Sequence, residues 1–339
     1  MNISEALDLV TLAESVDEHI LGEDAATWTE RLDTHAAQLR PAVDTLLHSG
    51  DDIGALRLAG ALSRYAQASG RVDQVRDLVD YVLAATSGRQ LSDAALARAL
   101  LVKGELAFRQ ADQAVAETAT QAALVAAQDL GDTRTEARAE MNLARVAFRK
   151  GDAPRIFEHA QRMLDLAGDD ARLTAGAVHM LAWGEYTAGN ASAATARFEE
   201  NVERYRTMGD LVGMAGELAN LGDLAAEVGD LDRAGSFLGQ ALDLAVAADS
   251  RYLLPGLLAS IAALAGARGR HGETVELAAA AEEQYVLAGL TPDPGGGVSA
   301  RILAEANAEL GQEYAEELAV HGRERTLDES VELARLALA

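Results

Sequence analysis

The stretch ELANLGDLAAEVGDLDRAGSFLGQALDLA, residues 217–245, decides the fold. Gly229 separates two segments rich in alanine and leucine, and small residues stand at fixed distances from it: Gly222 seven positions before, Ala234 five after and Ala241 twelve after. Small side chains at such offsets allow two antiparallel helices to approach closely, while larger aliphatic residues fill the seam between neighbouring pairs. The stretch therefore predicts a helix, a tight turn at Gly229 and a second helix.

The same pattern recurs along most of the chain. The turn positions follow one another at an almost constant spacing, and a small residue stands seven positions before each of them. A regular period of this size is typical of helical repeat arrays, in which each pair of helices packs on the next. We therefore predict an all-α fold, an α-α superhelix of six repeats, with turns at Gly70, Ala111, Gly151, Gly189, Gly229 and Gly269.

The organisation outside the repeats follows from periodicity and from helix breakers. Residues 1–50 are expected to form N-terminal helices over about 3–20 and 26–47, with a kink or helix boundary at Pro41. Residues 51–290 hold the six helical pairs. A Pro/Gly loop is predicted over 291–297, and residues 298–339 are expected to form helices that cap the end of the array.

Composition narrows the class of protein. The 339 residues are 49% apolar and contain no cysteine, which excludes disulfides and thiolate sites. With 29 basic and 54 acidic residues the net charge is −25, so direct binding of nucleic acid is not expected. The longest uncharged run, 252–267, includes Pro255 and is predicted to be a buried repeat helix and not a membrane span. We expect a soluble, cytoplasmic protein that does not bind membranes.

The sequence offers little sign of enzyme chemistry. Its seven histidines form no short metal-ligand spacing, and no nucleophile-elbow motif occurs. Lys103 and Lys150 are each followed by glycine, so neither can belong to a phosphate-binding loop. No segment combines a basic face with a helix-turn-helix pattern. We therefore predict a protein that is not an enzyme and that carries no cofactor or metal.

The repeat offsets match the tetratricopeptide pattern, with a repeat longer than usual. Beyond that, WTERLDTHAAQLRPAVDTLLHSGDDIGALRLAGALSRYAQASGR (28–71) resembles the start of the sensor region of large actinobacterial transcriptional regulators, the ATP-binding LuxR-type and antibiotic-regulatory-protein families. The tail ELGQEYAEELAVHGRERTLDESVELARLAL (309–338) resembles the end of those regions. A departure occurs at 36–38, Ala-Ala-Gln, where the family usually has His-Asp-Asn. The resemblance implies a regulatory scaffold without the ATPase and DNA-binding domains, and it names no ligand.

In tetratricopeptide arrays the first helix of each pair lines a groove. The resemblance places groove residues 13, 10, 6, 3 and 2 positions before each turn, and we call these the inner positions. Seven arginines and three acidic residues fall on the 30 inner positions, in a chain where acids outnumber bases almost two to one. The predicted ligand-binding residues are Arg98, Glu105, Phe108, Arg109, Arg138, Met141, Arg145, Phe148, Arg149, His179, Trp183, Tyr186 and Asp223.

Arginine presents a fixed fork of donors to carboxylate or phosphate, and the aromatic residues offer flat apolar surface. One hypothesis is a sensor that binds an anionic, partly aromatic small molecule. The alternative is an adaptor that grips an acidic peptide or partner protein. The principal site is predicted across repeats two to four, at Arg109, Arg145, Phe148, Trp183 and Tyr186.

Two further questions stay open at the level of sequence. Inner arginines could serve only to neutralise acids on adjacent helices, and inner aromatics only to fill the tight inside of the superhelix. The residues could also form a whole protein or the sensor half of a larger regulator. Association into a homo-oligomer is possible in either case.

Overall fold

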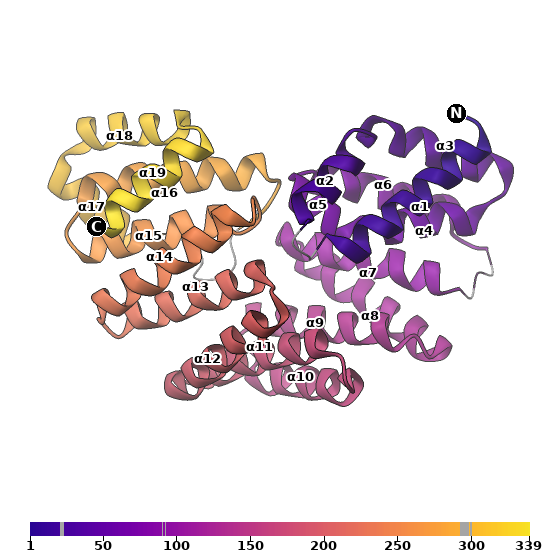
Figure 1. Cartoon of the computed structure of the whole chain (residues 1–339), viewed down its shortest axis with the longest axis horizontal. Helices are drawn as coiled ribbons and strands as arrows, with labels where there is room; N and C mark the ends of the chain where they lie inside the picture. Colours follow the sequence, from indigo (N-terminus) through magenta and orange to yellow (C-terminus); the bar gives the residue numbers. More distant parts are fainter. Residues whose placement is uncertain (21–23, 90, 92, 292–297, 299) are drawn as a thin grey trace. The chain divides into compact units, whose positions relative to one another are not determined.

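A computed structural model describes all residues except 21–23, 90, 92, 292–297 and 299. In the described part of the chain every regular element is a helix, so the predicted all-α helical-repeat fold is confirmed (Figure 1). The chain divides into two compact units, residues 1–189 and 190–339. This division falls at the turn of the fourth predicted pair, and each unit is described separately below.

Unit 1 begins with helices that precede the repeats and continues with the first helices and pairs of the array. Consecutive helices α7 and α8 pack closely, as do α9 and α10 and then α10 and α11. Its elements are α1 (Ile3–His19), α2 (Ala25–Asp33), the 3-10 helix η1 (Ala36–Gln38), α3 (Leu39–Ser49), α4 (Asp52–Gly60), α5 (Ser63–Ser69), α6 (Val72–Thr86), α7 (Ala94–Arg109), α8 (Gln113–Leu130), α9 (Thr133–Arg149), α10 (Ala153–Ala167) and α11 (Ala171–Thr187).

Two predicted helices of unit 1 are each broken in the structure. The helix expected over 26–47 is replaced by α2, η1 and α3. Pro41 lies in the first turn of α3, where a backbone N–H has no intrahelical acceptor, so the missing N–H of proline costs no hydrogen bond. The first helix of repeat one is divided into α4 and α5. At the end of α4, a Cβ on Gly60 would lie only 3.0 Å from the Cβ of Arg98 on α7. A side chain there would crowd α7, which favours glycine, and glycine is a weak helix former.

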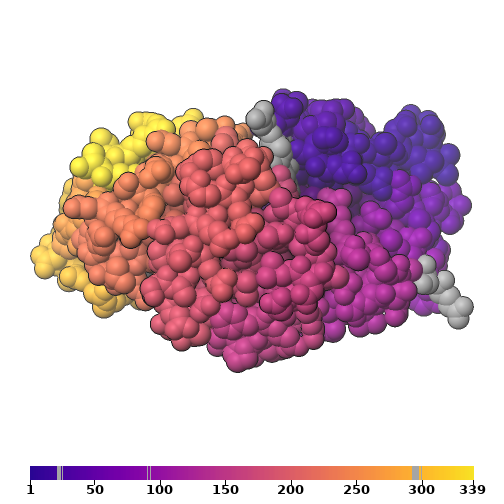
Figure 2. Space-filling view, turned by 60° about the horizontal axis from the view of Figure 1, so that its bottom comes forward, coloured from indigo at the N-terminus to yellow at the C-terminus, as the bar shows by residue number. Residues whose placement is uncertain are grey.

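Unit 2 continues the same architecture and ends in three further helices. The pairs α13/α14 and α15/α16 pack internally, α17 and α18 pack on α16, and α19 contacts α14, α15 and α16. In Figure 2 the yellow atoms of the C-terminal helices lie against the orange atoms of the preceding pair. Its helices are α12 (Ala191–Met208), α13 (Leu211–Glu227), α14 (Leu231–Ala247), α15 (Leu254–Ala267), α16 (His271–Leu287), α17 (Ala300–Leu310), α18 (Gln312–Glu324) and α19 (Leu327–Leu338).

Two sequence expectations concern this unit. The run predicted as a buried repeat helix contains α15, whose leucine and alanine side chains are largely buried. No helix among the described residues has both the length and the apolar character that a membrane crossing needs. Of the predicted loop 291–297, all but Thr291 lies outside the described residues.

The repeated joint between helices explains why the sequence pattern is so regular. Each predicted turn residue has a positive φ, for example 68° at Gly151 and 84° at Gly229. Such a backbone costs glycine little, because it has no Cβ. In half of the repeats the next residue is an aspartate whose carboxylate accepts a backbone hydrogen bond from the new helix, as Asp152 does from Arg155 and Asp230 from Arg233. The aspartate caps the second helix and fixes where it starts.

The small residue seven positions before each turn residue has the predicted packing role. A Cβ on Gly222 would lie 2.7 Å from Cγ of Leu238 on the partner helix, well inside ordinary contact distance. At Gly104 a Cβ would lie 3.1 Å from the backbone nitrogen of Thr120. The two helices of each of these pairs therefore approach closely enough to exclude even a methyl group.

Candidate functional site

The inner positions of repeats two to four lie on α7, α9 and α11, all within unit 1. Helix α7 contacts α9, and α9 contacts α11. Because each helix ends at the same kind of left-handed turn, residues at equal distance from the turn lie at corresponding places on successive helices. This arrangement allows side chains that are a whole repeat apart in the sequence to meet.

Aromatic residues of α9 and α11 form one cluster. The rings of Phe148 and Trp183 are 4.6 Å apart between centroids and tilted by 44°, and the ring of Tyr186 meets Trp183 edge-on at 5.6 Å. Trp183 also donates a hydrogen bond from Nε1 to Nε2 of His179, at 3.2 Å. All four side chains are half-buried. The structure thus brings together four of the predicted residues into a half-buried aromatic cluster.

Phe108 and Arg149 form a second contact, between α7 and α9. Phe108 is only 2% exposed and packs in a core cluster with residues of α8 and α9. The guanidinium of Arg149 lies 3.9 Å from the centre of its ring, and Nη1 of Arg149 donates to the Phe108 carbonyl oxygen at 2.7 Å. Arg109 is likewise buried, 5.6 Å from the same ring. The Phe108 ring is therefore covered by protein and presents no open face.

The remaining predicted residues of α7 and α9 differ in exposure. Met141 is half-buried against the core of repeat three, and its Cε would lie 3.0 Å from a Cβ at Gly176 on α11. Arg145 is half-buried and lies one helical turn after Met141 and one before Phe148, on the same face of α9. Arg98 is exposed, and within the described residues it makes no hydrogen bond or ion pair.

Glu105 and Arg138 are paired with each other. Nη2 of Arg138 donates to Oε2 of Glu105 at 2.9 Å, and the Ser63 hydroxyl donates to the same carboxylate. Desolvation by burial acts to raise the pKa of Glu105, but the charge of Arg138 and the two hydrogen-bond donors outweigh it and hold the pKa below its usual range. For this pair the charges are neutralised between the first helices of repeats two and three, as expected if inner arginines serve to neutralise acids on adjacent helices.

Asp223 belongs to unit 2, on α13. The Asp223 side chain is exposed to solvent. Protein atoms around its carboxyl group nevertheless desolvate it and raise its pKa to about 6, and a hydrogen bond from Ser260 opposes this shift. Sequence reasoning missed Ser260 and Ser63, because neither occupies an inner position. Each serine contacts an acidic residue at an inner position, Ser63 contacting Glu105 and Ser260 contacting Asp223. A search for hydroxyl residues at positions next to the inner ones would have found them.

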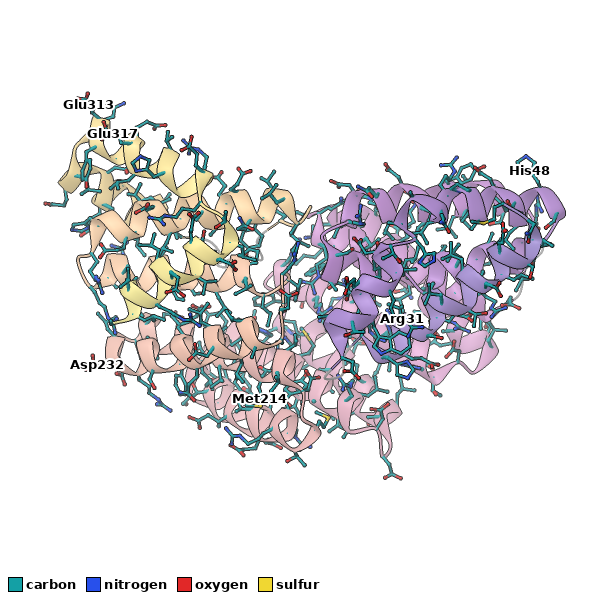
Figure 3. The ribbon with its side chains drawn as sticks, turned by 45° about the horizontal axis from the view of Figure 1, so that its top comes forward. Arg31, His48, Met214, Asp232, Glu313 and Glu317 are labelled. Carbon is teal, nitrogen blue, oxygen red and sulfur yellow. The ribbon has the colours of Figure 1, made fainter. Side chains whose placement is uncertain are left out.

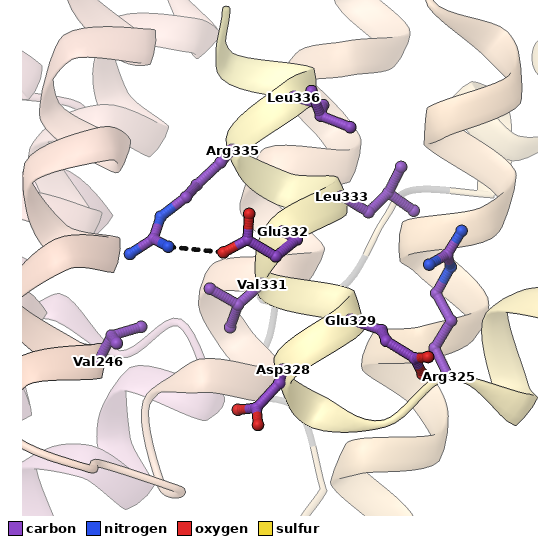
Figure 4. Close-up of a pocket in the computed structure, with 9 residues that line it drawn as sticks. All are labelled: Val246, Arg325, Asp328, Glu329, Val331, Glu332, Leu333, Arg335 and Leu336. Carbon is purple, nitrogen blue, oxygen red and sulfur yellow. Dashed lines mark hydrogen bonds and ion pairs between the residues drawn. The ribbon is translucent and has the colours of Figure 1, made fainter.

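Two hollows in unit 2 are lined by other residues. One, of about 390 Å³, is lined by Val246 of α14 and by residues of α19, among them Val331 and the ion pair between Arg335 and Glu332 (Figure 4). The second lies along α18, from which Glu313 and Glu317 point into solvent (Figure 3). Neither hollow is lined by a predicted site residue. Among the described residues, no group of three or more histidine and acidic side chains could hold a metal ion.

Comparison with known proteins finds no matching family model and no matching curated protein. Solved structures do match. A Rap protein complexed with Competence and Sporulation Factor is 14% identical, with a TM-score of 0.60, over 98% of this chain and 96% of that one. The apo form of RapI is 14% identical, with a TM-score of 0.51, over 99% and 97% of the two chains.

A third match is the Rap conjugation gene regulator of plasmid pLS20 in complex with the Phr* peptide. It is 11% identical, with a TM-score of 0.51, over 98% of this chain and 94% of that one. The likeness is one of fold. It places the chain among helical repeat structures of tetratricopeptide-like architecture along nearly its whole length.

Proposed function

We propose that this chain is a peptide-binding helical-repeat module, and that the inner positions of α7, α9 and α11 grip an acidic peptide. The observation that carries the proposal is the fold shared, over nearly the full length of both chains, with Rap structures in complex with Competence and Sporulation Factor and with the Phr* peptide. Extended surfaces of stacked helices are suited to peptides, because each repeat can contact one segment of the ligand.

The charges of the site support an acidic ligand. The chain as a whole carries a net charge of −25 and repels acidic partners, so a partner of that kind needs a local excess of positive charge. Five arginines and a single acidic residue, Glu105, occupy the inner positions of repeats two to four. Glu105 is paired with Arg138. Guanidinium groups bind carboxylates through paired hydrogen bonds, and the cluster around Trp183 adds a surface for apolar side chains.

The observations favour a peptide over the small molecule that the sequence first suggested. The rings of Phe148, Trp183 and Tyr186 pack on one another, and the ring of Phe108 is covered by Arg149. Such packing offers a surface along which a chain can lie. The regulatory role implied by the resemblance to actinobacterial regulators is part of the same proposal.

The test is selection of binding peptides from a displayed library of short random sequences, followed by titration of synthetic peptides. We expect enrichment of aspartate and glutamate together with an aromatic residue. Arg145→Ala should weaken binding of the selected peptides by about 1.5–3 kcal/mol, the usual value of a hydrogen bond to a charged group. Tyr186→Ala should weaken binding as well, through lost contact area. Arg301→Ala and Tyr314→Ala remove exposed residues of the same types in unit 2 and serve as matched controls.

Enrichment of neutral or basic peptides would contradict the proposal, as would site variants that bind as well as the two controls. Thermal melts of each variant separate lost binding from lost folding. If no peptide is enriched but an aromatic carboxylic acid binds and Arg145→Ala abolishes that binding, the small-molecule hypothesis replaces this one.

A further inference from the structure

Helix α1 precedes the repeats, yet it packs on the first helices of repeat one. It contacts α4 and α5 as well as α2 and α3. In Figure 1 the indigo ribbon of α1 runs beside α4. The apolar side of α1, which includes Val10, Ala13 and Val16, is fully buried in this packing. Helix α1 therefore covers part of the face on which repeat one carries its inner positions.

The ion pair between Glu14 of α1 and Arg57 is bidentate. Nε and Nη2 of Arg57 donate to the two carboxylate oxygens of Glu14, at 2.8 and 2.6 Å. Arg57 occupies the first inner position of repeat one, counted toward the turn at Gly70. Two parallel hydrogen bonds fix the geometry of a guanidinium–carboxylate pair more strictly than a single contact does.

Asp17, one turn further along α1, meets two more inner arginines. Nη1 of Arg64 donates to the Asp17 carbonyl oxygen at 2.6 Å and lies 3.3 Å from Oδ1 of its carboxylate. Nη1 of Arg138 on α9 lies 4.0 Å from Oδ2. Oδ1 of Asp17 is buried and accepts no hydrogen bond. The Asp17 carboxylate therefore interacts with the two arginines mainly through its charge, because Oδ1 accepts no hydrogen bond.

Two largely buried arginines beside one another need more than one carboxylate. Burial lowers the pKa of Arg64 to about 10, with the charge of Arg138 adding to the effect. The pKa of Arg138 is raised, because the charges of Glu105 and Asp17 outweigh its desolvation, so both guanidinium groups remain protonated at neutral pH. Glu105 neutralises one of the two charges. Asp17 neutralises the other, and it comes from a helix outside the repeats. Without Asp17 the cluster would keep one uncompensated positive charge, which is costly in a site shielded from water.

We propose that Arg57, Arg64 and Arg138 form a site for a helical segment that presents two carboxylates one helical turn apart, and that the last two turns of α1 are its resident occupant. The pattern that α1 shows to the site is an apolar stripe with acids at 14 and 17. An external acidic peptide with the same pattern competes with α1. This competition rests on the proposed peptide-binding function; the resident role of α1 does not.

The first test measures amide hydrogen exchange over residues 10–20 in the full chain. Glu14→Gln with Asp17→Asn should speed exchange there at least tenfold, because docking loses its charge pairing. Asp8→Asn with Glu18→Gln is the matched control. It removes the same charge from exposed positions of α1 that have no partner among the described residues, and exchange should not change.

The second test adds a fluorescein-labelled peptide of residues 3–19 to each full-length protein. It should bind the Glu14→Gln/Asp17→Asn variant at least tenfold more tightly than the wild type, and the same peptide with Gln and Asn at 14 and 17 should not bind. Equal protection of α1 in all proteins, or equal binding of both peptides, would overturn the inference.

The outcomes also separate the two proposals. If library selection yields no acidic peptide while α1 exchanges and binds as expected, the proposed function fails and the resident site stands. If acidic peptides bind at repeats two to four, but the Glu14→Gln/Asp17→Asn substitutions do not change exchange over residues 10–20, only the inference about α1 fails. Should the double variant not fold, the charge-swapped protein Glu14→Arg/Arg57→Glu decides. Hydrogen exchange over residues 10–20 should be close to the wild-type rate in this charge-swapped protein and fast in the single variant Glu14→Arg. Fast exchange in both proteins would refute the pairing of Glu14 with Arg57.

Discussion

Gly222→Ala and Gly216→Ala are a matched pair of substitutions within one helix. Both glycines lie in α13, and either change replaces the weakest ordinary helix former with the strongest, worth up to about 1 kcal/mol. They differ in what the new methyl group would meet. At Gly216 nothing lies within 4 Å, whereas at Gly222 the methyl would be 2.7 Å from Cγ and 2.8 Å from Cδ2 of Leu238.

The magnitude follows from that contrast. Carbon atoms pack favourably at about 3.5–4.0 Å, so Leu238 would have to move by roughly 1 Å. Leu238 is fully buried in α14, and close-packed protein interiors leave little room for such a movement. Overpacking of this kind costs about 1–3 kcal/mol. We expect Gly216→Ala to stabilise unit 2 by up to about 1 kcal/mol, and Gly222→Ala to be about 1–3 kcal/mol less stable than Gly216→Ala. Gly222→Leu should be less stable than Gly222→Ala.

The measurement is urea unfolding followed by far-ultraviolet circular dichroism. Tryptophan fluorescence is unsuitable, because Trp28 and Trp183 both belong to unit 1. Midpoints should shift while the slope with denaturant stays constant, since the surface exposed on unfolding is the same. If the two alanine variants have equal stability, the close approach of α13 and α14 at Gly222 is not a constraint on the fold.

The other predictions concern the turns and the titrating groups. Ala111→Gly should stabilise the chain by about 0.5–1 kcal/mol in the same urea assay, because Ala111 has a φ of 59° and a left-handed alanine is strained; a loss of stability would contradict this. Because the pKa of Glu105 is lowered by folding, its contribution to stability is complete above about pH 4.5 and is lost as the pH falls through the folded pKa. Glu105→Gln should therefore cost about 3–5 kcal/mol at neutral pH, by leaving Arg138 with only the more distant carboxylate of Asp17, and the gap to wild type should shrink in acid; a gap that does not depend on pH would refute the pairing. Carboxyl carbon NMR should show Asp223 titrating near pH 6, and Ser260→Ala should raise that value further, since the Ser260 hydrogen bond lowers the pKa; no upward shift would exclude that bond.

The repeats could be predicted because their signals are local. A left-handed turn excludes most residues, and a close helix pair excludes large ones, so both constraints are visible in the sequence at a fixed period. Even Ala111, where the sequence has no glycine, adopts the predicted turn conformation. The break between α4 and α5 was not predictable in this way, because it depends on the approach of α7, a helix from the next repeat.

The site residues were predicted from offsets alone, and offsets do not determine exposure. Phe108 and Phe148 occupy the same position in successive repeats. Phe108 is covered by Arg149, whereas the residue equivalent to Arg149 in the following repeat is Thr187, and Trp183 meets the ring of Phe148 instead. What covers each ring is therefore decided by the next repeat. The pairing of Glu14 with Arg57 was equally hidden, because it depends on where a helix outside the repeats docks.

The uniform joint between helices has a consequence for how such a chain can change length. The segment from Asp112 to Gly151 begins with a capping aspartate and ends with a left-handed glycine, and Asp152 begins the next segment in the same way. An in-frame duplication of this segment would meet the same backbone geometry at both of its ends. Whole modules can therefore be gained or lost during evolution without a new linker, and each gain adds one more inner helix on which ligand specificity can diverge.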